Sequence, residues 1–289
     1  MITFFYWLAG FGLFVLVLMA IKRRRPYPSA SGDSIASHSS VSQPQPSSTT
    51  LLTVATFNIH RGKGMDRTTD LALSASVLAT AQADIMALNE VRGRFFWRRQ
   101  DQAEIIARHL GCHHLFAPIQ SQWQQPYLGN ALLANVMTNS WQRLPLIKRF
   151  GKSPTLVSRA HRNLIIAQFP HPTGAYHVLI THLDRRAIRA QQLNEVFAHF
   201  CRYPRSILMG DLNTDYDDPQ LIQLCRESQA QDALASLGDE QRIDAVICRG
   251  ITPVKAKRLL TNASDHPYYW CTFEMRLPAD HAESEAVQP

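Results

Sequence analysis

The sequence predicts an α/β fold in which sheets of short, buried strands are covered by helices. Three observations support this prediction. Short apolar runs recur along the chain and end in polar residues, a pattern typical of buried strands that lead into loops. Longer segments with Asp caps or a helical apolar period lie between these runs. About 225 residues follow the N-terminal region, a length that suits one domain with a sizeable core.

Five apolar runs are the predicted strands, and each carries polar residues at or near its end. The run Ser206–Met209 comes first in importance, because Gly210 breaks it and Asp211 and Asn213 follow two residues apart. The other four are Thr53–Phe57 before Asn58, Asp84–Leu88 before Glu90, Tyr176–Ile180 before His182, and Ile243–Ile247, which contains Asp244. Because strand ends lie together in stacked sheets, we expect these polar residues to form one site.

Three segments are predicted to be helices that cover the sheets. Asp70–Ala81 and Asp101–Leu110 each begin with an aspartate that can cap a helix. Within Arg185–Phe200, the residues Leu193, Val196, Phe197 and Phe200 recur at the spacing of one helical face. We expect that face to pack on the core. The arginines of the first turns, Arg185, Arg186 and Arg189, either are exposed to solvent, which is the first expectation, or approach a phosphate.

The residue types at the strand ends indicate a phosphoesterase. Carboxylates are hard oxygen donors suited to Mg²⁺ or Mn²⁺, carboxamides are neutral ligands or phosphate donors, and histidines move protons near neutral pH. The members of this set are Glu90, Asp211, Asp265, Asn58, Asn213, His182 and His266. The chain has no Cys-x-x-Cys or His-Glu-x-x-His zinc motif, no Gly-x-x-x-x-Gly-Lys loop and no Gly-x-Ser-x-Gly elbow. With these sites excluded, the reaction that fits the residue types is metal-assisted attack of water on a phosphate ester.

Seven short motifs occur in a fixed order between residues 51 and 276. They are Thr56–Ile59, Ala83–Glu90, Gly129–Leu133, Thr181–Leu183, Gly210–Asn213, Arg242–Asp244 and Ser264–His266. Together they resemble the endonuclease/exonuclease/phosphatase superfamily, which includes deoxyribonuclease I, exonuclease III, neutral sphingomyelinase and inositol polyphosphate 5-phosphatases. The resemblance implies a four-layer α/β/β/α sandwich: two mixed β-sheets packed face to face, helices outside, and a site at one edge of the sheets.

The resemblance also implies a catalytic role for five residues. His266 would activate the attacking water, and Asp244 would hold the other ring nitrogen and stabilise the imidazolium. Asp211 and Asn213 would position the water and the phosphoryl oxygens, while His182 would hydrogen-bond the phosphate and assist the leaving oxygen.

The remaining site residues are expected to bind the metal and the substrate. By the same resemblance, Glu90 and Asp265 are the metal-side carboxylates, with Asn58 near them. Asn130 and Arg162 are the predicted substrate-binding residues. The implied cofactor is Mg²⁺ or Mn²⁺.

The chain departs from the family pattern at several positions. Asn89 stands where Gln is usual before the metal-binding Glu, and Ala134–Asn135 replaces a common Ser-Arg or Ser-Lys pair. No clear match exists for the tyrosine that some DNA-repair members place near the phosphate. After Asn58, either Asp66 is a second acidic metal ligand or the loop Arg61–Met65 contacts a phosphate directly.

The N-terminus is predicted to anchor the protein in a bacterial inner membrane as a single-pass helix. Ile2–Ile21 contains no charged residue, and its length as a helix is roughly 30 Å, enough for a bilayer core. Lys22–Arg25 follow at once and favour a cytoplasmic catalytic domain. The alternative is a signal peptide with Tyr27–Ser31 as its cleavage region, although the basic residues follow the apolar run instead of preceding it.

Four regions are therefore expected along the chain. Residues 1–25 form the anchor with its basic flank, and residues 26–50, rich in Ser, Pro and Gln, form a flexible linker. Residues 51–277 form the catalytic domain, and residues 278–289 form a disordered acidic tail. The five widely spaced cysteines indicate free thiols in a reducing compartment.

Composition leaves the substrate open. The net charge is +7, but four of the 30 basic residues are Lys22–Arg25, and the other 26 exceed the 23 acidic residues by only three. After Glu90, Arg92, Arg94, Arg98 and Arg99 surround Phe95–Trp97. This segment suits a nucleic-acid strand, an anionic lipid headgroup, or a plain solvated face.

We expect a monomeric, membrane-tethered, Mg²⁺-dependent phosphodiesterase. A nuclease is the first expectation, a lipid or headgroup phosphodiesterase the second, and a catalytically silent binding module on the same fold the third.

Overall fold

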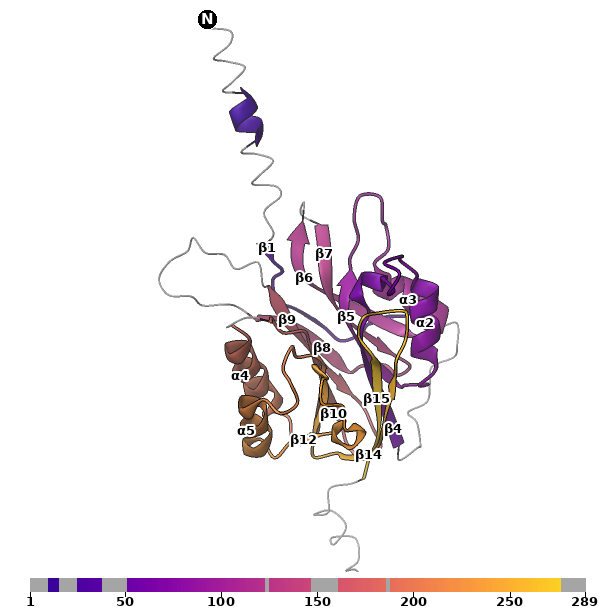
Figure 1. Ribbon diagram of the computed structural model, residues 1–289, viewed down its shortest axis with the longest axis vertical. Coiled ribbons are helices and arrows are strands. Elements are labelled where there is room, and N and C mark those ends of the chain that lie inside the picture. The colour runs from indigo at the N-terminus through magenta and orange to yellow at the C-terminus, as the bar shows by residue number, and fades with distance from the viewer. Residues whose placement is uncertain are drawn as a thin grey trace, which may run out of the picture.

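Two mixed β-sheets packed face to face form the centre of the molecule (Figure 1). The computed structural model describes residues 10–15, 25–37, 51–122, 125–146, 161–185 and 188–276. Helices lie on the outer face of each sheet, so the described part of the chain has the layer order α/β/β/α (Figure 1). The predicted α/β sandwich of two mixed sheets flanked by helices is confirmed.

The first sheet has eight strands. Along the sheet their order is β1 (Arg25–Pro26), β6 (His113–Gln122), β7 (Gln125–Ala134), β5 (Ile85–Arg92), β4 (Leu51–Asn58), β15 (Tyr268–Glu274) and β14 (Thr252–Leu259), with β3 (Ala36–Ser37) paired to β6. Strands β4 and β5 are parallel, and the other neighbours are antiparallel.

The second sheet has seven strands. Their order is β12 (Gln231–Asp232), β13 (Asp244–Arg249), β11 (Ser206–Asp211), β10 (Tyr176–Thr181), β9 (Arg162–Phe169), β8 (Ser140–Leu146) and β2 (Ala30–Gly32). Strands β10 and β11 are parallel, so both run toward the same edge, and the remaining pairs are antiparallel.

Four helices cover the outer faces. They are α2 (Leu71–Ala79) and α3 (Gln102–Leu110) on the first sheet, and α4 (Arg189–Phe200) and α5 (Pro219–Glu227) on the second. The predicted caps are present, because Asp70 accepts a hydrogen bond from the backbone of Leu73 and Asp101 accepts one from Glu104. Two short 3₁₀ turns, η1 (His60–Gly62) and η2 (Ala235–Leu237), lie in loops.

Alternation of side chains along the strands produces three apolar layers. In β4, Val54 belongs to the core between the sheets, whereas Ala55 packs with the residues of α2 and α3. In β9, Ile165 faces the core between the sheets and Ile166 faces α4. Strands buried on both faces explain why their sequences are continuous apolar runs.

Part of the segment expected to be a flexible linker is paired with the sheets. β1, β2 and β3 lie within residues 25–37, and Ile35 between them is 6% exposed and belongs to the core between the sheets. The Arg143 guanidinium also donates two hydrogen bonds, of 3.2 and 2.7 Å, to the carbonyl of Pro28. The globular unit therefore begins near residue 25, earlier than the sequence prediction of residue 51.

The predicted anchor and tail fall largely outside the described residues. Of the run Ile2–Ile21, only residues 10–15 are described, and they are helical. Within the described part of the chain, no helix has the length and apolar character needed to cross a bilayer. Residues 38–50 and the predicted acidic tail, 278–289, lie outside the described residues.

Candidate active site

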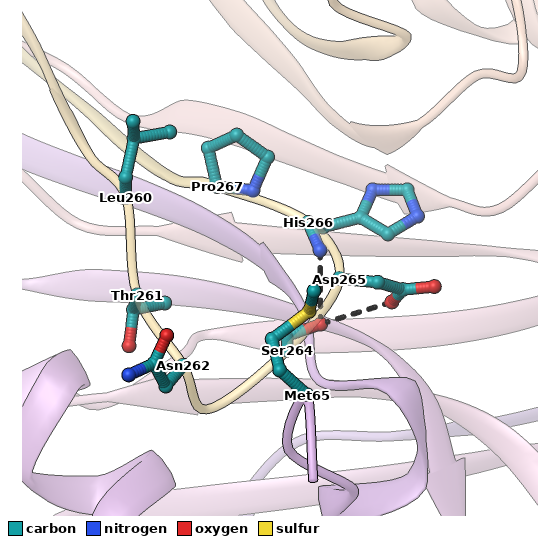
Figure 2. A pocket seen from close by; sticks show the side chains of 8 residues that line it. All are labelled: Met65, Leu260, Thr261, Asn262, Ser264, Asp265, His266 and Pro267. Carbon is teal, nitrogen blue, oxygen red and sulfur yellow. Dashed lines mark hydrogen bonds between the residues drawn. The ribbon is translucent and has the colours of Figure 1, made fainter. Parts of the chain in front are cut away.

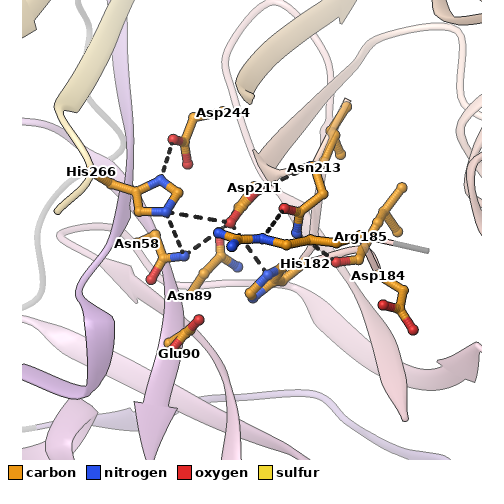
Figure 3. Close-up of polar contacts among 12 residues, drawn as sticks. Asn58, Asn89, Glu90, His182, Asp184, Arg185, Asp211, Asn213, Asp244 and His266 are labelled. Carbon is orange, nitrogen blue, oxygen red and sulfur yellow. Dashed lines mark hydrogen bonds and ion pairs between the residues drawn. The ribbon is translucent and has the colours of Figure 1, made fainter. Parts of the chain in front are cut away.

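The polar ends of the predicted strands converge at one edge of the two sheets (Figure 3). Strands β4 and β5 of the first sheet bring Asn58 and Glu90, and the second sheet brings His182 and Asp211. The loop before β15 brings His266 to the same place. Residues far apart in the sequence thus face one another because four strands of two sheets meet there.

A histidine and an aspartate form the most tightly defined pair of the site. His266 Nδ1 lies 2.7 Å from Asp244 Oδ2, and both side chains are buried. Ser264 holds the loop that carries His266, because its hydroxyl donates to the carbonyl of Asn58 at 2.6 Å and accepts from the His266 amide at 3.2 Å. The ring orientation is therefore fixed, with Nε2 left toward the centre of the site.

Negative charge around His266 favours its protonated form. Burial lowers the pKa of His266, but its hydrogen bond to Asp244 and the charges of Asp244, Asp211 and Asp265 outweigh burial and raise the pKa to about 9. The Asp244 carboxylate thus fixes the orientation of the His266 ring and favours its charged form.

Asp211 is a buried carboxylate at the centre of the site. Its Oδ2 accepts a hydrogen bond of 3.0 Å from Asn58 Nδ2 and lies 3.3 Å from His182 Nε2 and 3.8 Å from His266 Nε2. The side chain is fully buried, and burial together with the charge of Asp244 raises the pKa of Asp211 to about 7. Asp211 can therefore accept or release a proton near neutral pH.

His182 is neutral in this setting. Its ring is buried, and burial, followed by the charges of Arg162, His266, Arg185 and Arg61, lowers the pKa of His182 well below its usual value. A neutral imidazole keeps one N–H donor and one acceptor, so His182 can donate a hydrogen bond to an oxygen without carrying charge.

Asn213 is committed to holding an arginine. Its Oδ1 accepts a hydrogen bond of 2.8 Å from Arg185 Nε, and its Nδ2 donates one of 2.8 Å to the carbonyl of Leu183. The backbone of Asn213 has a left-handed φ of 47°, which fixes the turn after β11. Both side-chain amide atoms of Asn213 are thus occupied, although we expected them to contact a phosphate. The terminal nitrogens of exposed Arg185 are better placed for that contact (Figure 3).

Gly210 allows strands β10 and β11 to deliver His182 and Asp211 side by side. Its φ is 134°, and a Cβ at this position would lie 1.9 Å from the carbonyl oxygen of Thr181. Only glycine accepts both the conformation and this close approach.

Glu90 lies at a bulge in β5. The register with β7 shifts between Leu88 and Val91, and Glu90 has a left-handed φ of 55°. Such bulges re-aim a side chain beside a functional site, at a cost in backbone strain. The bulge turns Glu90 toward the site edge, where Arg61 Nη2 lies 3.1 Å from Glu90 Oε2.

The residues predicted to hold a metal are compatible with a divalent ion. Glu90 Oε2 is buried and makes no hydrogen bond to a described residue, although it contacts Arg61. Half-exposed Asp265 lies 3.3 Å from His60 Nδ1. A positive or protonatable group, Arg61 or His60, thus contacts each of the two carboxylates that a metal cation could bind. Hard oxygen donors of this kind suit Mg²⁺ or Mn²⁺.

A second grouping of potential ligand atoms lies deeper in the site. Atoms of Asp211, Asp244 and His266 lie within 4.8 Å of one another. Asp244 and His266 already bond each other, and the carboxylates Glu90 and Asp265 lie outside this group. Asp66 takes no part in either group, since its carboxylate binds the backbone and hydroxyl of Thr68.

Buried asparagines connect the two sheets beneath the site. Asn89 Oδ1 accepts from the Asp211 amide at 2.8 Å, and Asn89 Nδ2 donates to Asn130 Oδ1 at 2.9 Å and to the Thr181 carbonyl at 3.1 Å. Asn130 Nδ2 in turn donates to Asn163 Oδ1 at 2.8 Å. Asn130 is 1% exposed, and both atoms of its side-chain amide are hydrogen-bonded to other asparagines. Asn130 therefore supports the site from beneath and does not face a substrate.

Arg162 supplies positive charge beside the carboxylates. It begins β9, and its charge interacts with Asp184, Asp211 and Glu90, while burial lowers its pKa. Among the described residues, its Nε has no hydrogen-bond partner. A substrate anion at the site would meet this charge, which fits the predicted binding role.

A pocket of about 340 Å³ adjoins the catalytic histidine (Figure 2). Met65 lines one side, and the loop before β15 provides the rest, including Thr261, Asp265 and His266. Space for a substrate group is therefore present next to Asp265.

Sequence reasoning missed Arg185, Asn89 and Asn163 as site residues. Arg185 follows His182 by three residues, but its direction depends on the hydrogen bond from its Nε to Asn213, which lies 28 residues further along the chain. Asn89, Asn130 and Asn163 each interrupt an apolar strand, and such strand-interior amides could have signalled a buried network.

The sequence matches one protein family across most of the globular unit. The model of the Endonuclease/Exonuclease/phosphatase family matches residues 55–266, a range that includes every predicted site residue from Asn58 to His266. The chain belongs to this family.

Solved structures of the family share the fold. An endonuclease/exonuclease/phosphatase from Beutenbergia cavernae DSM 12333 is 21% identical, with a TM-score of 0.63, over 78% of this chain and 72% of that one. A family protein from Bacteroides vulgatus is 14% identical, with a TM-score of 0.62, over 78% and 99%. TDP2 of D. rerio, solved with a single-strand DNA product, is 18% identical, with a TM-score of 0.57, over 77% and 98%. No curated protein matches the chain.

Proposed function

We propose that the chain is a metal-dependent phosphodiesterase that uses a histidine-activated water. The observation that carries this proposal is the His266–Asp244 pair at 2.7 Å, with His266 Nε2 directed toward Asp211 at the centre of the site. Members of the endonuclease/exonuclease/phosphatase family are generally phosphoesterases or nucleases. A binding module would have little use for an orienting aspartate behind a buried histidine.

In the proposed reaction, water attacks phosphorus and the bond from phosphorus to the leaving oxygen breaks. His266 Nε2 takes the proton of the water, and Asp244 stabilises the resulting imidazolium through Nδ1. Asp211 accepts a hydrogen bond from the water and orients it. His182 donates a hydrogen bond from its N–H to the leaving oxygen. The proton that His266 took from the water is released through solvent and protonates that oxygen.

Positive groups meet the charge that develops on the phosphoryl oxygens. Arg185, held through its Nε by Asn213, presents its terminal nitrogens, and Arg162 adds its charge from β9. A divalent ion held by Glu90 and Asp265 near Asn58 would add charge at the phosphoryl oxygen and counter the negative field that holds a proton on His266.

A polynucleotide strand is the first candidate substrate. The support is the structural similarity to TDP2 of D. rerio, whose structure contains a single-strand DNA product. A lipid-linked phosphodiester is the second candidate, because Phe96 and Trp97, six and seven residues after Glu90, are exposed to solvent.

A hydrolysis screen of the purified full-length chain tests the proposal. Bis(4-nitrophenyl) phosphate, single-stranded and duplex DNA, RNA and phospholipid vesicles are incubated with Mg²⁺, Mn²⁺ or EDTA. We expect metal-dependent hydrolysis of at least one diester that falls by about 10³-fold in His266→Ala. His109→Ala, which alters an exposed histidine of α3, is the matched control and should retain full activity. Tight binding of one substrate without turnover would support the silent binding module instead.

A further inference from the structure

An exposed aromatic turn follows β5, the strand that carries Glu90. Phe96 is 67% exposed and Trp97 is 79% exposed, although both are large apolar side chains. They occupy the apex of a tight turn that is closed by reciprocal backbone hydrogen bonds of 2.8 Å between Phe95 and Arg98. Exposed apolar groups on an ordered turn indicate a binding surface.

The three rings of this turn form one apolar tip. The centroid of Phe95 lies 5.2 Å from that of Phe96 and 4.3 Å from that of Trp97, with interplanar angles of 70° and 71°. The rings therefore meet edge to face instead of presenting separate parallel platforms. This shape suits insertion as a wedge into a lipid interface better than stacking with successive bases.

Positive charges surround the tip. Arg94 pairs with Glu104, but within the described residues no carboxylate lies at ion-pair distance from Arg92, Arg98 or Arg99. Burial and the nearby charge of Arg92 lower the pKa of Arg98, as expected of cations that lack a countercharge. The turn thus combines apolar rings with unpaired cations, the complement of an anionic membrane surface.

The turn lies at the end of the sheet where the N-terminal segment joins the domain. Arg25 of β1 pairs with Ser121 of β6, Ser121 pairs with Pro126 of β7, and the Gly93 amide donates to the Tyr127 carbonyl beside it. Three strand spacings separate β1 from β5, so Arg25 lies about 14 Å from Gly93 along one edge. Figure 1 shows β1 and the loop between β5 and α3 at the same end.

We propose that the turn Phe95–Arg99 docks the active-site rim onto an anionic lipid bilayer. In the sequence, the uncharged run Ile2–Ile21 and the basic residues Lys22–Arg25 lead into β1, which lies at the same end of the sheet as the turn. Phe95, the first residue of the turn, follows Glu90 by five residues, a distance of about 17 Å along a fully extended strand. Docking would therefore bring a phosphodiester of the headgroup layer within reach of the site.

Hydrogen exchange of the full-length chain in lipid nanodiscs tests this surface. Discs contain phosphatidylcholine alone or with about one third phosphatidylserine, and peptides covering residues 93–99 are compared with the exposed connection 170–175 at the opposite ends of β9 and β10. With two unpaired arginines in the turn, Arg98 and Arg99, we expect docking to be favoured about 30-fold by anionic over neutral lipid. Exchange in residues 93–99 should slow accordingly, and exchange in 170–175 should not change.

Two variants separate the aromatic turn from general effects. The double variant Phe96→Ser and Trp97→Ser should abolish the protection of residues 93–99, whereas Val254→Ser, at an exposed position of β14, should retain it. Equal exchange on neutral and anionic discs in the wild type would overturn the proposal. Protection by a single-stranded oligonucleotide in detergent, without protection by anionic discs, would also overturn it and assign the turn to nucleic acid.

The exchange readout is independent of hydrolysis. A chain that fails the activity screen can still show docking, and a chain that hydrolyses diesters can still fail to dock. Co-purification of the chain with discs separately tests the N-terminal anchor.

Discussion

Replacing Asn89 with alanine should destabilise the protein and, at the same time, remove the hydrogen bond that holds the backbone of Asp211. Asn89 is fully buried and makes three hydrogen bonds that join β5 of the first sheet to β7, β10 and β11. At about 1 kcal/mol each, their loss amounts to about 3 kcal/mol, and the buried groups left without partners raise the total to as much as about 5 kcal/mol. For a domain of this size, the midpoint of thermal unfolding should fall by about 10 °C.

Thermal and urea unfolding of the metal-free protein, followed by circular dichroism, measure this effect. Asn194→Ala is the matched control, because exposed Asn194 on α4 bonds only Gln220 at the surface, and its change should stay within about 0.5 kcal/mol. A double-mutant cycle between Asn89→Ala and Asn130→Ala should show coupling of about 1 kcal/mol. A loss below about 1 kcal/mol for Asn89→Ala would refute the idea that the asparagine chain ties the sheets together.

Three further predictions concern the backbone, the proton and the metal. Gly210→Ala should lower the free energy of unfolding by about 3 kcal/mol or more, because the new Cβ would clash with the carbonyl of Thr181. The control Gly111→Ala also lies at a positive φ but has open space around it, so it should lose only about 1 kcal/mol. Similar losses in the two variants would contradict the close-packing argument. The pKa of His266 is raised from 6.5 to about 9. In the metal-free protein, the wild type should therefore be more stable than His266→Gln by the full amount below pH 6.5, and this difference should disappear as the pH rises through about 9. Urea unfolding across this range measures the difference, and a difference that grows with pH would contradict the predicted direction. Glu90→Gln and Asp265→Asn should each weaken Mn²⁺ binding about tenfold or more, as measured by calorimetry. The control Asp33→Asn, at an exposed position near β2, should leave Mn²⁺ binding unchanged. Unaltered binding in both site variants would show that these carboxylates do not hold the metal.

The features that followed from the sequence are those set by local pattern. Apolar runs predicted the strands, and Asp70 and Asp101 marked the starts of α2 and α3 because an N-cap depends only on the next three residues. The convergence of Asp211 and His266 could be expected because neighbouring strand ends share an edge.

The features that the sequence could not supply depend on partners far along the chain. Asn130 was recognisable as a motif residue, but its supporting role depends on Asn163 in the other sheet. Arg185 is exposed as expected, but its direction is fixed by a hydrogen bond from its Nε to Asn213, which is 28 residues away. Residues 25–37 have the composition of a linker, yet they pair along the sheets, bury Ile35 in the core and accept hydrogen bonds from Arg143 and Trp141.

Single-turnover hydrolysis in ¹⁸O-labelled water tests the central claim most directly. If His266 activates a water that attacks phosphorus, the phosphate product of bis(4-nitrophenyl) phosphate should carry one ¹⁸O atom and the released nitrophenol none, and His266→Ala should suppress this product. Label in the nitrophenol, or a labelled phosphate that forms equally fast in His266→Ala, would contradict the account.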